Sequence, residues 1–228
     1  MPKVPGRAST SVTDARENTC ENTRENTREN TYVLATANPG KAREIEAILG
    51  ASCPELTLVL RPIDVPDVVE DGKTLVANAR LKAKALCRAT GLPAIADDTG
   101  LFVEALGGAP GVDAAVFSGP HANADENCRK LLHELERVGA VSPQSRKARF
   151  TTVAFVAWPG GDETWCEGCA DGVIIDENRG DGFGYDPLFA PLDGDGRTFG
   201  ELALTEKNAL SHRSRAFVAL ATALQARR

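Results

Sequence analysis

The amino-acid sequence predicts a mixed α/β domain in which a central sheet is flanked by helices. Between residues 31 and 138, short apolar runs rich in β-branched residues alternate with stretches whose apolar residues recur at helical spacing. Between residues 150 and 175, strand-like runs follow one another across a glycine-rich turn, which is typical of an antiparallel meander. Strands that first alternate with helices and then form hairpins favour the mixed α/β class.

The first half of the chain supplies predicted strands and helices in alternation. The first helix carries Ile45, Ile48 and Leu49 at helical spacing and is expected to stop at Gly50. The second is amphipathic and is expected to be closed by Gly91. The predicted order is strand 31–36, helix 41–50, strand 56–60, helix 74–90 and strand 92–96.

The second half predicts one helix, a set of antiparallel strands and a final helix. Leu131, Leu132 and Leu135 follow helical spacing in the first of these segments, and Phe217, Leu220 and Leu224 do so in the last. The predicted order is helix 123–138, strands 150–158, 164–170 and 172–175, and helix 211–225.

The N-terminal segment differs from the rest of the chain. From Arg16 to Thr31 it reads RENT-CENT-RENT-RENT, with no apolar periodicity and no aromatic residue. Such a segment cannot bury a core face, so residues 1–30 are predicted to be a disordered low-complexity extension. Residues 31–228 are predicted to form a single domain.

Composition excludes several classes of protein. The net charge of −6 argues against general nucleic-acid binding, which relies on a basic surface. No apolar stretch is long enough for a membrane span, and the first residues lack the apolar core of a secretory signal, so a cytoplasmic protein is predicted. The six cysteines are expected to be reduced, and the CxxC at Cys166 and Cys169 is interpreted as packing thiols rather than zinc ligands.

Two lysine-bearing motifs are compatible with phosphate binding. TANPGK, which contains Thr36, Asn38 and Lys41, joins a strand to a helix, and a helix N-terminus beside a lysine favours an anion. In the next predicted helix Lys82 follows Asn78 by one turn, after an acidic loop that contains Glu70. Each fragment alone favours the simpler interpretation, a plain turn or a solvated surface charge, over a phosphate site.

Two adjacent acids, Asp97 and Asp98, follow the apolar run Ala94–Ala96. They are expected at the C-terminal end of a strand, where α/β proteins usually place ligands. Carboxylates suit Mg²⁺, which typically takes one or two of them together with phosphates and water. A solvated loop is the alternative interpretation, and these residues alone do not decide between the two.

The last two motifs carry aromatic and basic side chains. In GDGFGYDPLF, Phe183 lies between two glycines. This pattern is compatible with a ring that stacks on a base and with a rigid loop whose aromatic residues pack into the core. In EKNALSHR, Ser211 is a plausible N-cap that would place His212 and Arg213 at the start of the final helix. Taken together, lysines, carboxylates, an aromatic loop and a His-Arg pair describe a nucleoside triphosphate site.

The chain from about residue 32 onward resembles the inosine triphosphate pyrophosphatase family. The resemblance rests on TANPGK, ADDTGL with LGGAPGV, FGYDPLF and EKNALSHR in this order. It implies an α/β fold, ITPase-like or anticodon-binding-like, with two lobes around a nucleotide cleft, and it implies a homodimer that depends on Mg²⁺. It also implies hydrolysis of deaminated purine triphosphates (ITP, dITP, XTP) to the monophosphate and pyrophosphate.

The resemblance also assigns roles to individual residues. Asp98 matches the catalytic acid and metal ligand, with Glu70, or alternatively Asp67, as the second metal carboxylate. The positions matched to substrate binding are Thr36, Asn38, Lys41, Lys82, Thr99, Phe183, Gly184, Tyr185, Asp186, Lys207, His212 and Arg213.

The sequence departs from the family pattern at several positions. Ala77 and Leu75 stand where the family often has an acid and a phenylalanine. GVDAAVFSG replaces the usual ySARy pattern and lacks its arginine. A pyrophosphatase of modified pyrimidine triphosphates and a non-catalytic nucleotide sensor are the alternative functions.

Overall fold

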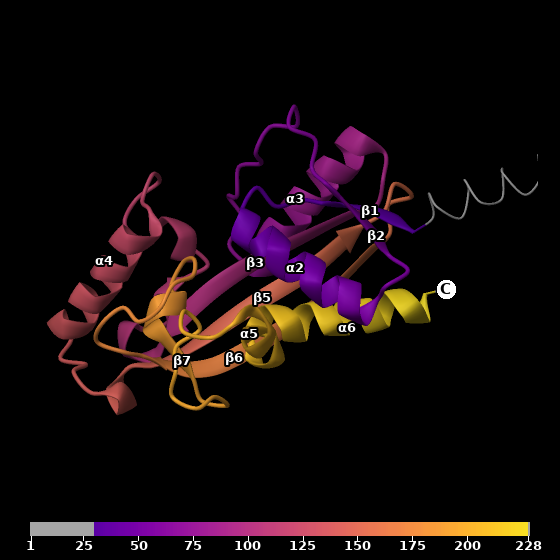
Figure 1. The fold of residues 1–228 in the computed structure, drawn as a ribbon. Helices are drawn as coiled ribbons and strands as arrows, with labels where there is room; N and C mark the ends of the chain where they lie inside the picture. The colour runs from indigo at the N-terminus through magenta and orange to yellow at the C-terminus, as the bar shows by residue number, and fades with distance from the viewer. Residues whose placement is uncertain (1–29, 228) are drawn as a thin grey trace, which may run out of the picture.

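A computed structural model describes residues 30–227 of the protein. A seven-stranded mixed sheet forms its centre (Figure 1). The strand order is β2-β1-β3-β5-β6-β7, and β4 pairs with β3. The pairs β1–β2 and β1–β3 are parallel, and the remaining pairs are antiparallel. The predicted mixed α/β class with a meander in its second half is therefore confirmed. The strands are β1 (Thr31–Leu34), β2 (Thr57–Leu60), β3 (Ala94–Val103), β4 (Pro110–Gly111), β5 (Lys147–Ala157), β6 (Glu163–Ile174) and β7 (Phe189–Pro191).

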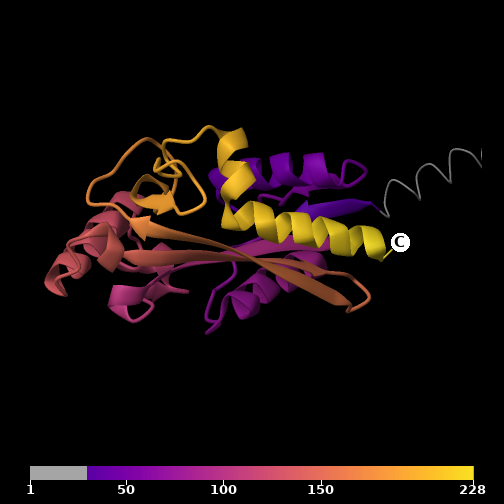
Figure 2. The same cartoon turned by 90° about the horizontal axis from the view of Figure 1, so that it is seen from below.

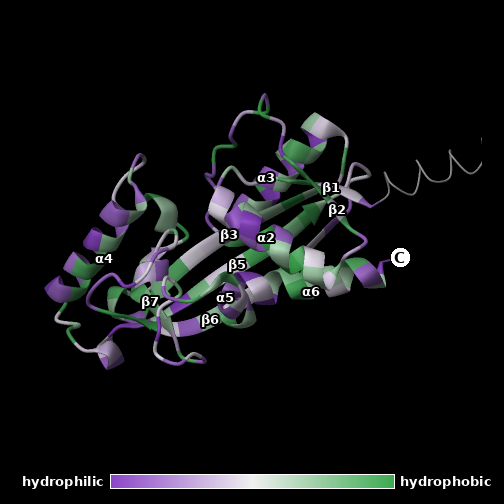
Figure 3. Cartoon of the chain, in the orientation of Figure 1, coloured by the Kyte–Doolittle hydropathy of each residue, from purple (hydrophilic) through white to green (hydrophobic). Residues whose placement is uncertain are grey.

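Helices cover both faces of the sheet (Figure 2). Helices α2 and α6 pack together on one face, over a cluster that includes Ile45, Ile95 and Phe217. Helix α3 packs on the opposite face, and α4 lies beside the far end of the sheet with β7 (Figure 1). Hydrophobic residues concentrate where helices meet the sheet (Figure 3). The helices are α2 (Pro39–Ser52), α3 (Leu75–Thr90), α4 (Ala124–Arg137), α5 (Leu204–Leu210) and α6 (His212–Ala226).

The helix caps follow the local sequence. Thr74 accepts a hydrogen bond from the Ala77 N–H at the start of α3, and Gly91 closes that helix in the left-handed conformation. Asn123 and Glu126 form a capping box at the start of α4. Ser211 caps α6 as predicted, and its side chain accepts from the N–H of Ser214.

Strand β3 is longer than predicted. The expected end at Ala96 is wrong, because β5 pairs with β3 along its whole length, from Ala94 to Val103. Asp97 and Asp98 therefore lie inside a strand and not at its end. On the other side of β3 the parallel neighbour β1 stops at Leu34, which pairs with Ile95. That edge of β3 is consequently open to the cleft at the two acids.

Other boundaries also shift. Helix α2 continues through Gly50 to Ser52, because the Cys53 N–H still bonds to the Leu49 carbonyl. The predicted strands 164–170 and 172–175 form one strand, β6, held along its length by β5. Helix α5 and strand β7 were not predicted. The disorder predicted for residues 1–30 falls almost entirely outside the described residues. Within the described part of the chain, no helix is long and apolar enough to cross a membrane.

Two glycines should respond in opposite directions to substitution by alanine. A Cβ on Gly168 would lie 2.3 Å from the Ala216 nitrogen and the His212 carbonyl oxygen, because α6 packs directly on β6. Gly168→Ala is therefore expected to lower the free energy of unfolding by about 1–3 kcal/mol. A Cβ added to Gly50 of helix α2 would have no atom within 4 Å. Gly50→Ala should raise that free energy by about 0.5–1 kcal/mol. Denaturant unfolding measures both, and equal effects would contradict the packing described here.

Candidate active site

Two adjoining pockets open at the unpaired edge of β3. The first has a volume of about 360 Å³, and the second of about 220 Å³. Asn38, Lys41 and Ala115 line both, so the two form one continuous cleft. The predicted residues that line the first pocket are Thr36, Asn38, Lys41, Glu70 and Lys82, and those that line the second include Thr99, Phe183, Gly184, Tyr185, Asp186, His212 and Arg213.

The start of helix α2 supplies one wall of the first pocket. The side chain of Asn38 caps the helix and accepts hydrogen bonds from the N–H groups of Gly40 and Lys41, at 2.8 and 3.1 Å. Thr36 accepts from the Asn38 N–H. A Cβ on Gly40 would approach the Phe183 ring to 2.6 Å, so glycine lets the aromatic loop pack against the helix start. The motif TANPGK thus joins the two pockets.

The two adjacent acids point to opposite faces of β3, because side chains alternate along a strand. Asp97 faces α2 and α6, where it pairs with Lys41 at 3.1 Å and Arg213 at 3.4 Å. Asp98 faces α3, where it accepts from Lys82 at 3.0 Å and Asn78 at 3.3 Å. Each carboxylate therefore has its own cations, and this separation offsets the repulsion expected between neighbours.

The surroundings give the two acids different pKa values. Burial alone would raise the pKa of Asp97, but Lys41 and Arg213 outweigh it and hold that pKa well below its usual range. Burial raises the pKa of Asp98 to about 6, although Lys82 and Lys41 oppose the shift. Asp97 is thus a permanent counter-ion, whereas Asp98 has the proton affinity of a general base that works near neutral pH.

Lys82 joins two carboxylates at the first pocket. Its ammonium donates to Glu70 at 2.9 Å and to Asp98 at 3.0 Å. Burial disfavours its charged form, yet Asp98 and Asp97 outweigh this and raise the pKa of Lys82. Asp67, the alternative second carboxylate, lines the same pocket and is held by Arg61 at 2.6 Å. Both candidates therefore remain near the site.

The carboxylates at this pocket fit a magnesium ion that takes part of its coordination from a substrate. Glu70 and Asp98 already converge on one cationic centre, the Lys82 ammonium. Within residues 30–227, no group of three His, Cys, Asp or Glu side chains is arranged to hold a metal by itself. Mg²⁺ usually takes one or two carboxylates together with phosphates and water, so the donor set agrees with that pattern.

Basic groups surround the aromatic ring of the second pocket. The Lys207 ammonium lies 4.6 Å from the centre of the Phe183 ring, and the Arg213 guanidinium lies 5.4 Å from it. Both cations are almost fully buried, with 5% and 1% of their surface exposed. Asp186 accepts from Lys207 at 2.6 Å and from the Phe183 N–H at 3.2 Å, which fixes the aromatic loop. Lys207 itself lies behind the pocket and does not line it.

Glu44 of α2 is a residue that the motifs do not reveal. It is buried and accepts from Lys207 at 2.5 Å and from Arg213 at 2.6 Å. The local signal is a carboxylate one turn before Ile48 on the apolar face of α2, a position where an acid needs a partner. Its partners come from the far end of the chain, so the sequence does not identify them.

His212 and Tyr185 are held in the core beside the pocket. The His212 ring stacks on Phe150 at 4.4 Å, and burial holds its pKa well below the usual value, so the ring is neutral. Its buried Nδ1 atom has no hydrogen-bond partner among the described residues. The Tyr185 hydroxyl donates to the Ala114 carbonyl at 2.8 Å, so Phe183 is the aromatic ring available for stacking.

The predicted residues therefore gather at one cleft, with two qualifications. Asp98 lies just behind Lys82 and does not itself line the first pocket, whereas Asp97 does. Lys207 reaches the second pocket only through Phe183 and Asp186. Cys166 and Cys169, placed on β6, are free thiols.

The chain is similar in sequence to known proteins over most of its length. The profile of the Ham1 family matches residues 32–223. A dITP/XTP pyrophosphatase of Geobacter sulfurreducens is 48% identical over 190 residues, which span 82% of this chain and 93% of that protein. A dITP/XTP pyrophosphatase of Leifsonia xyli is 45% identical over 85% of this chain and 95% of that protein.

Solved structures share the fold. A HAM1 protein from Coxiella burnetii superimposes with a TM-score of 0.75 at 38% identity, over 86% of this chain and 98% of that one. A structure from Mycobacterium abscessus described as nucleoside-triphosphatase / dITP/XTP pyrophosphatase gives a TM-score of 0.64 at 38% identity, over 83% and 97%. Sequence and fold thus point to the same group of proteins.

Proposed function

Because this chain belongs to the Ham1 family, we propose that it hydrolyses deaminated purine nucleoside triphosphates, namely ITP, dITP and XTP, to the monophosphate and pyrophosphate. The observation that carries the proposal is the continuous cleft, which has lysines and carboxylates in one pocket and a cation-flanked aromatic ring in the other. A triphosphate fits the first pocket and a purine base the second. The names of the related dITP/XTP pyrophosphatases support this assignment.

The proposed reaction is a direct displacement at the α-phosphorus. A water molecule attacks, a bond forms between its oxygen and phosphorus, and the bond from the α-phosphorus to the bridging oxygen of the β-phosphate breaks. Asp98 accepts the proton of the water, and pyrophosphate leaves with the bonding electron pair. Lys41 and Lys82 hold the β- and γ-phosphates and stabilise their charge. No covalent intermediate is needed.

Mg²⁺ is the proposed cofactor, with Asp98 as one ligand and Glu70 as the preferred second. When bound together with the nucleotide, it would neutralise charge on the phosphate oxygens. Glu70 is preferred because its carboxylate accepts from the same Lys82 ammonium that bonds to Asp98. Asp67 is the alternative ligand. The Mg²⁺ concentration that gives half-maximal activity, measured for Glu70→Gln and for Asp67→Asn, would separate the two, because loss of a ligand raises that concentration.

The base pocket is proposed to select the 6-oxo group of inosine and xanthosine. That acceptor suits donors from His212 and Arg213, with Lys207 holding the aromatic loop from behind. Adenine presents an amino group instead and leaves buried donors unpaired, at a cost of about 1–3 kcal/mol for each donor. Thr99, which accepts from Arg213 at 3.1 Å, keeps the guanidinium in place.

Pyrophosphate release from a panel of nucleotides tests the function. With Mg²⁺, turnover of ITP, dITP and XTP is expected to exceed that of ATP by about 10²-fold or more, because several unpaired donors add their costs. Without Mg²⁺, turnover should fall to background. Preferred hydrolysis of a modified pyrimidine triphosphate would favour that alternative function. Binding of ITP without pyrophosphate release would identify a nucleotide sensor and overturn the proposed reaction.

The homodimer implied by the resemblance and the cytoplasmic location predicted from composition remain predictions. Sedimentation equilibrium of the purified protein measures the first. A mass equal to one chain of 24.2 kDa at micromolar concentration would contradict it. Fractionation of the native cells measures the second.

A further inference from the structure

One wall of the second pocket is a short segment whose backbone is bonded by side chains from other elements. This wall segment, residues 114–118, lies between β4 and α4 and includes a single turn of 3-10 helix. The Tyr185 hydroxyl donates to the Ala114 carbonyl, and the Lys130 ammonium donates to the Phe117 carbonyl. The Ser118 hydroxyl donates to the Glu126 carbonyl of α4, and the other side-chain bonds come from Asn127 of the same helix.

Asn127 binds the wall segment through both the nitrogen and the oxygen of its side-chain amide. The Nδ2 group donates to the Ala115 carbonyl at 2.9 Å, and Oδ1 accepts from the Ser118 N–H at 2.7 Å. Only 4% of the residue is exposed, and Asn127 also lines the second pocket, which Lys130 does not. A buried amide is costly to leave unpaired, so the position of the wall segment and the position of α4 are coupled through this residue.

The wall segment and the aromatic loop both line the second pocket. Ala114 and Ala115 line it together with Phe183, and Ala115 also lines the first. Alanine has no side-chain torsion that could reorient to follow a bound base. The width of the pocket therefore depends on where the backbone of the wall segment is held. The bonds from α4 that hold it come from Asn127 and Lys130, in addition to the bond from Tyr185.

We propose that Asn127 is a positioning residue that, with Lys130 one turn along α4, holds residues 114–118 as the fixed wall of the nucleobase pocket. The proposal rests on the proposed function, since it assigns the second pocket to a purine base. The proposal predicts that loosening the wall weakens binding of the base and leaves binding of the phosphates and the chemical step nearly unchanged. The wall segment contributes Ala115 alone to the first pocket, and the charged side chains there, such as Lys41 and Lys82, lie on other elements.

The test measures binding of two probes by calorimetry. Inosine monophosphate reports on the base pocket, and inorganic tripolyphosphate reports on the first pocket alone. Asn127→Ala is expected to weaken binding of inosine monophosphate by about tenfold while changing that of tripolyphosphate by less than about threefold. In turnover of ITP, KM should rise by a similar factor and kcat should stay within about threefold of the wild type.

A matched variant separates positioning from general destabilisation of α4. Asn123→Ala removes the helix cap but none of the bonds to the wall segment. It should lower the melting temperature and weaken binding of inosine monophosphate by clearly less than Asn127→Ala does, because the neighbouring Ala122 and Ala124 line the second pocket but the wall segment keeps its bonds. If Asn123→Ala weakened binding of inosine monophosphate as much as Asn127→Ala does, the loss of binding would come from the lower stability of α4, and the proposal would be overturned.

Lys130→Met provides a second, independent variant. Lys130 does not line the second pocket, yet its ammonium holds the Phe117 carbonyl. We expect weaker binding of inosine monophosphate by about threefold or more, with tripolyphosphate binding unchanged. Unchanged binding of inosine monophosphate in this variant, or no binding of that probe by the wild type, overturns the proposal. Wild-type binding of the probe without turnover of ITP would instead overturn only the proposed reaction.

Discussion

Replacing Asp98 by asparagine is expected to lower turnover of ITP by about 10³-fold or more, because the variant loses both the proton acceptor and a carboxylate ligand for Mg²⁺. The side chain keeps its size, and its Oδ1 atom can still accept from Lys82, which lies at 3.0 Å in the native protein. The protein should therefore remain folded. Steady-state pyrophosphate release and the melting temperature together measure the two expectations.

The control for this variant is Asp171→Asn. Asp171 lies on β6, is about half exposed and pairs with Arg149 at 2.6 Å, and it lines neither pocket of the cleft. Its turnover should stay within about twofold of the wild type, since exposed ion pairs contribute little. Turnover of the Asp98→Asn variant within tenfold of the control would contradict the role of Asp98 as the base.

The second large effect concerns stability. Glu44→Gln is expected to lower the free energy of unfolding by about 3–5 kcal/mol, because it removes the charge that balances two buried cations. Lys207 and Arg213 would then face only Asp186 and Asp97 in surroundings that water does not reach. Denaturant unfolding measures the loss, and KM for ITP should rise as well because both cations flank the Phe183 ring.

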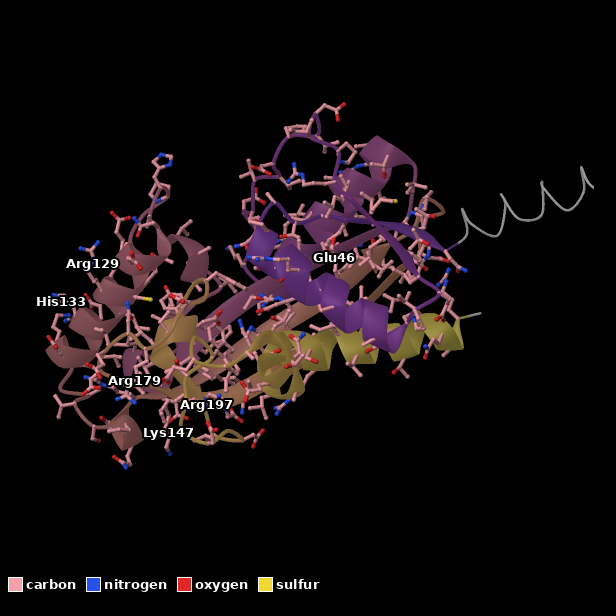
Figure 4. The ribbon with its side chains drawn as sticks, in the orientation of Figure 1. Glu46, Arg129, His133, Lys147, Arg179 and Arg197 are labelled. Atoms are coloured by element: carbon pink, nitrogen blue, oxygen red, sulfur yellow. The ribbon has the colours of Figure 1, made fainter. Side chains whose placement is uncertain are left out.

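The matched control lies on the same helix. Glu46 is exposed on the outer side of α2, two residues after Glu44 (Figure 4). Glu46→Gln makes the identical substitution on the identical helix and should change the free energy of unfolding by less than about 0.5 kcal/mol. Equal stability of the two variants would show that the network around Glu44 is not needed for folding.

Local features were the most predictable from the sequence. The caps at Gly91 and Ser211, and the helix starts at Thr74 and Asn123, depend on residues a few positions apart, so spacing and residue type suffice to predict them. The same holds for helix periodicity. Gly50 was misread as a stop because a glycine ends a helix only where the next residues leave the helical conformation, and here the backbone bonds continue.

Long-range contacts were the least predictable. The length of β3 depends on β5, whose paired residues lie about fifty positions further along the chain. No local signal in Ala94–Ala96 shows that the strand continues through two acids. The two carboxylates do lie at the cleft, but they lie inside β3 and not at its end.

The sequence by itself determined the class of fold, the family and most of the residues that gather at the cleft, because short motifs with defined chemistry survive as local patterns. Only the tertiary structure decided how those residues are used. It separates Asp97 from Asp98 onto opposite faces of β3, pairs Glu44 with Lys207 across 163 positions, and ties the wall segment to Asn127. The physical reason is that burial and charge pairing depend on neighbours in space, and a pKa or an ion pair in the core is set by elements that meet only when the chain has folded.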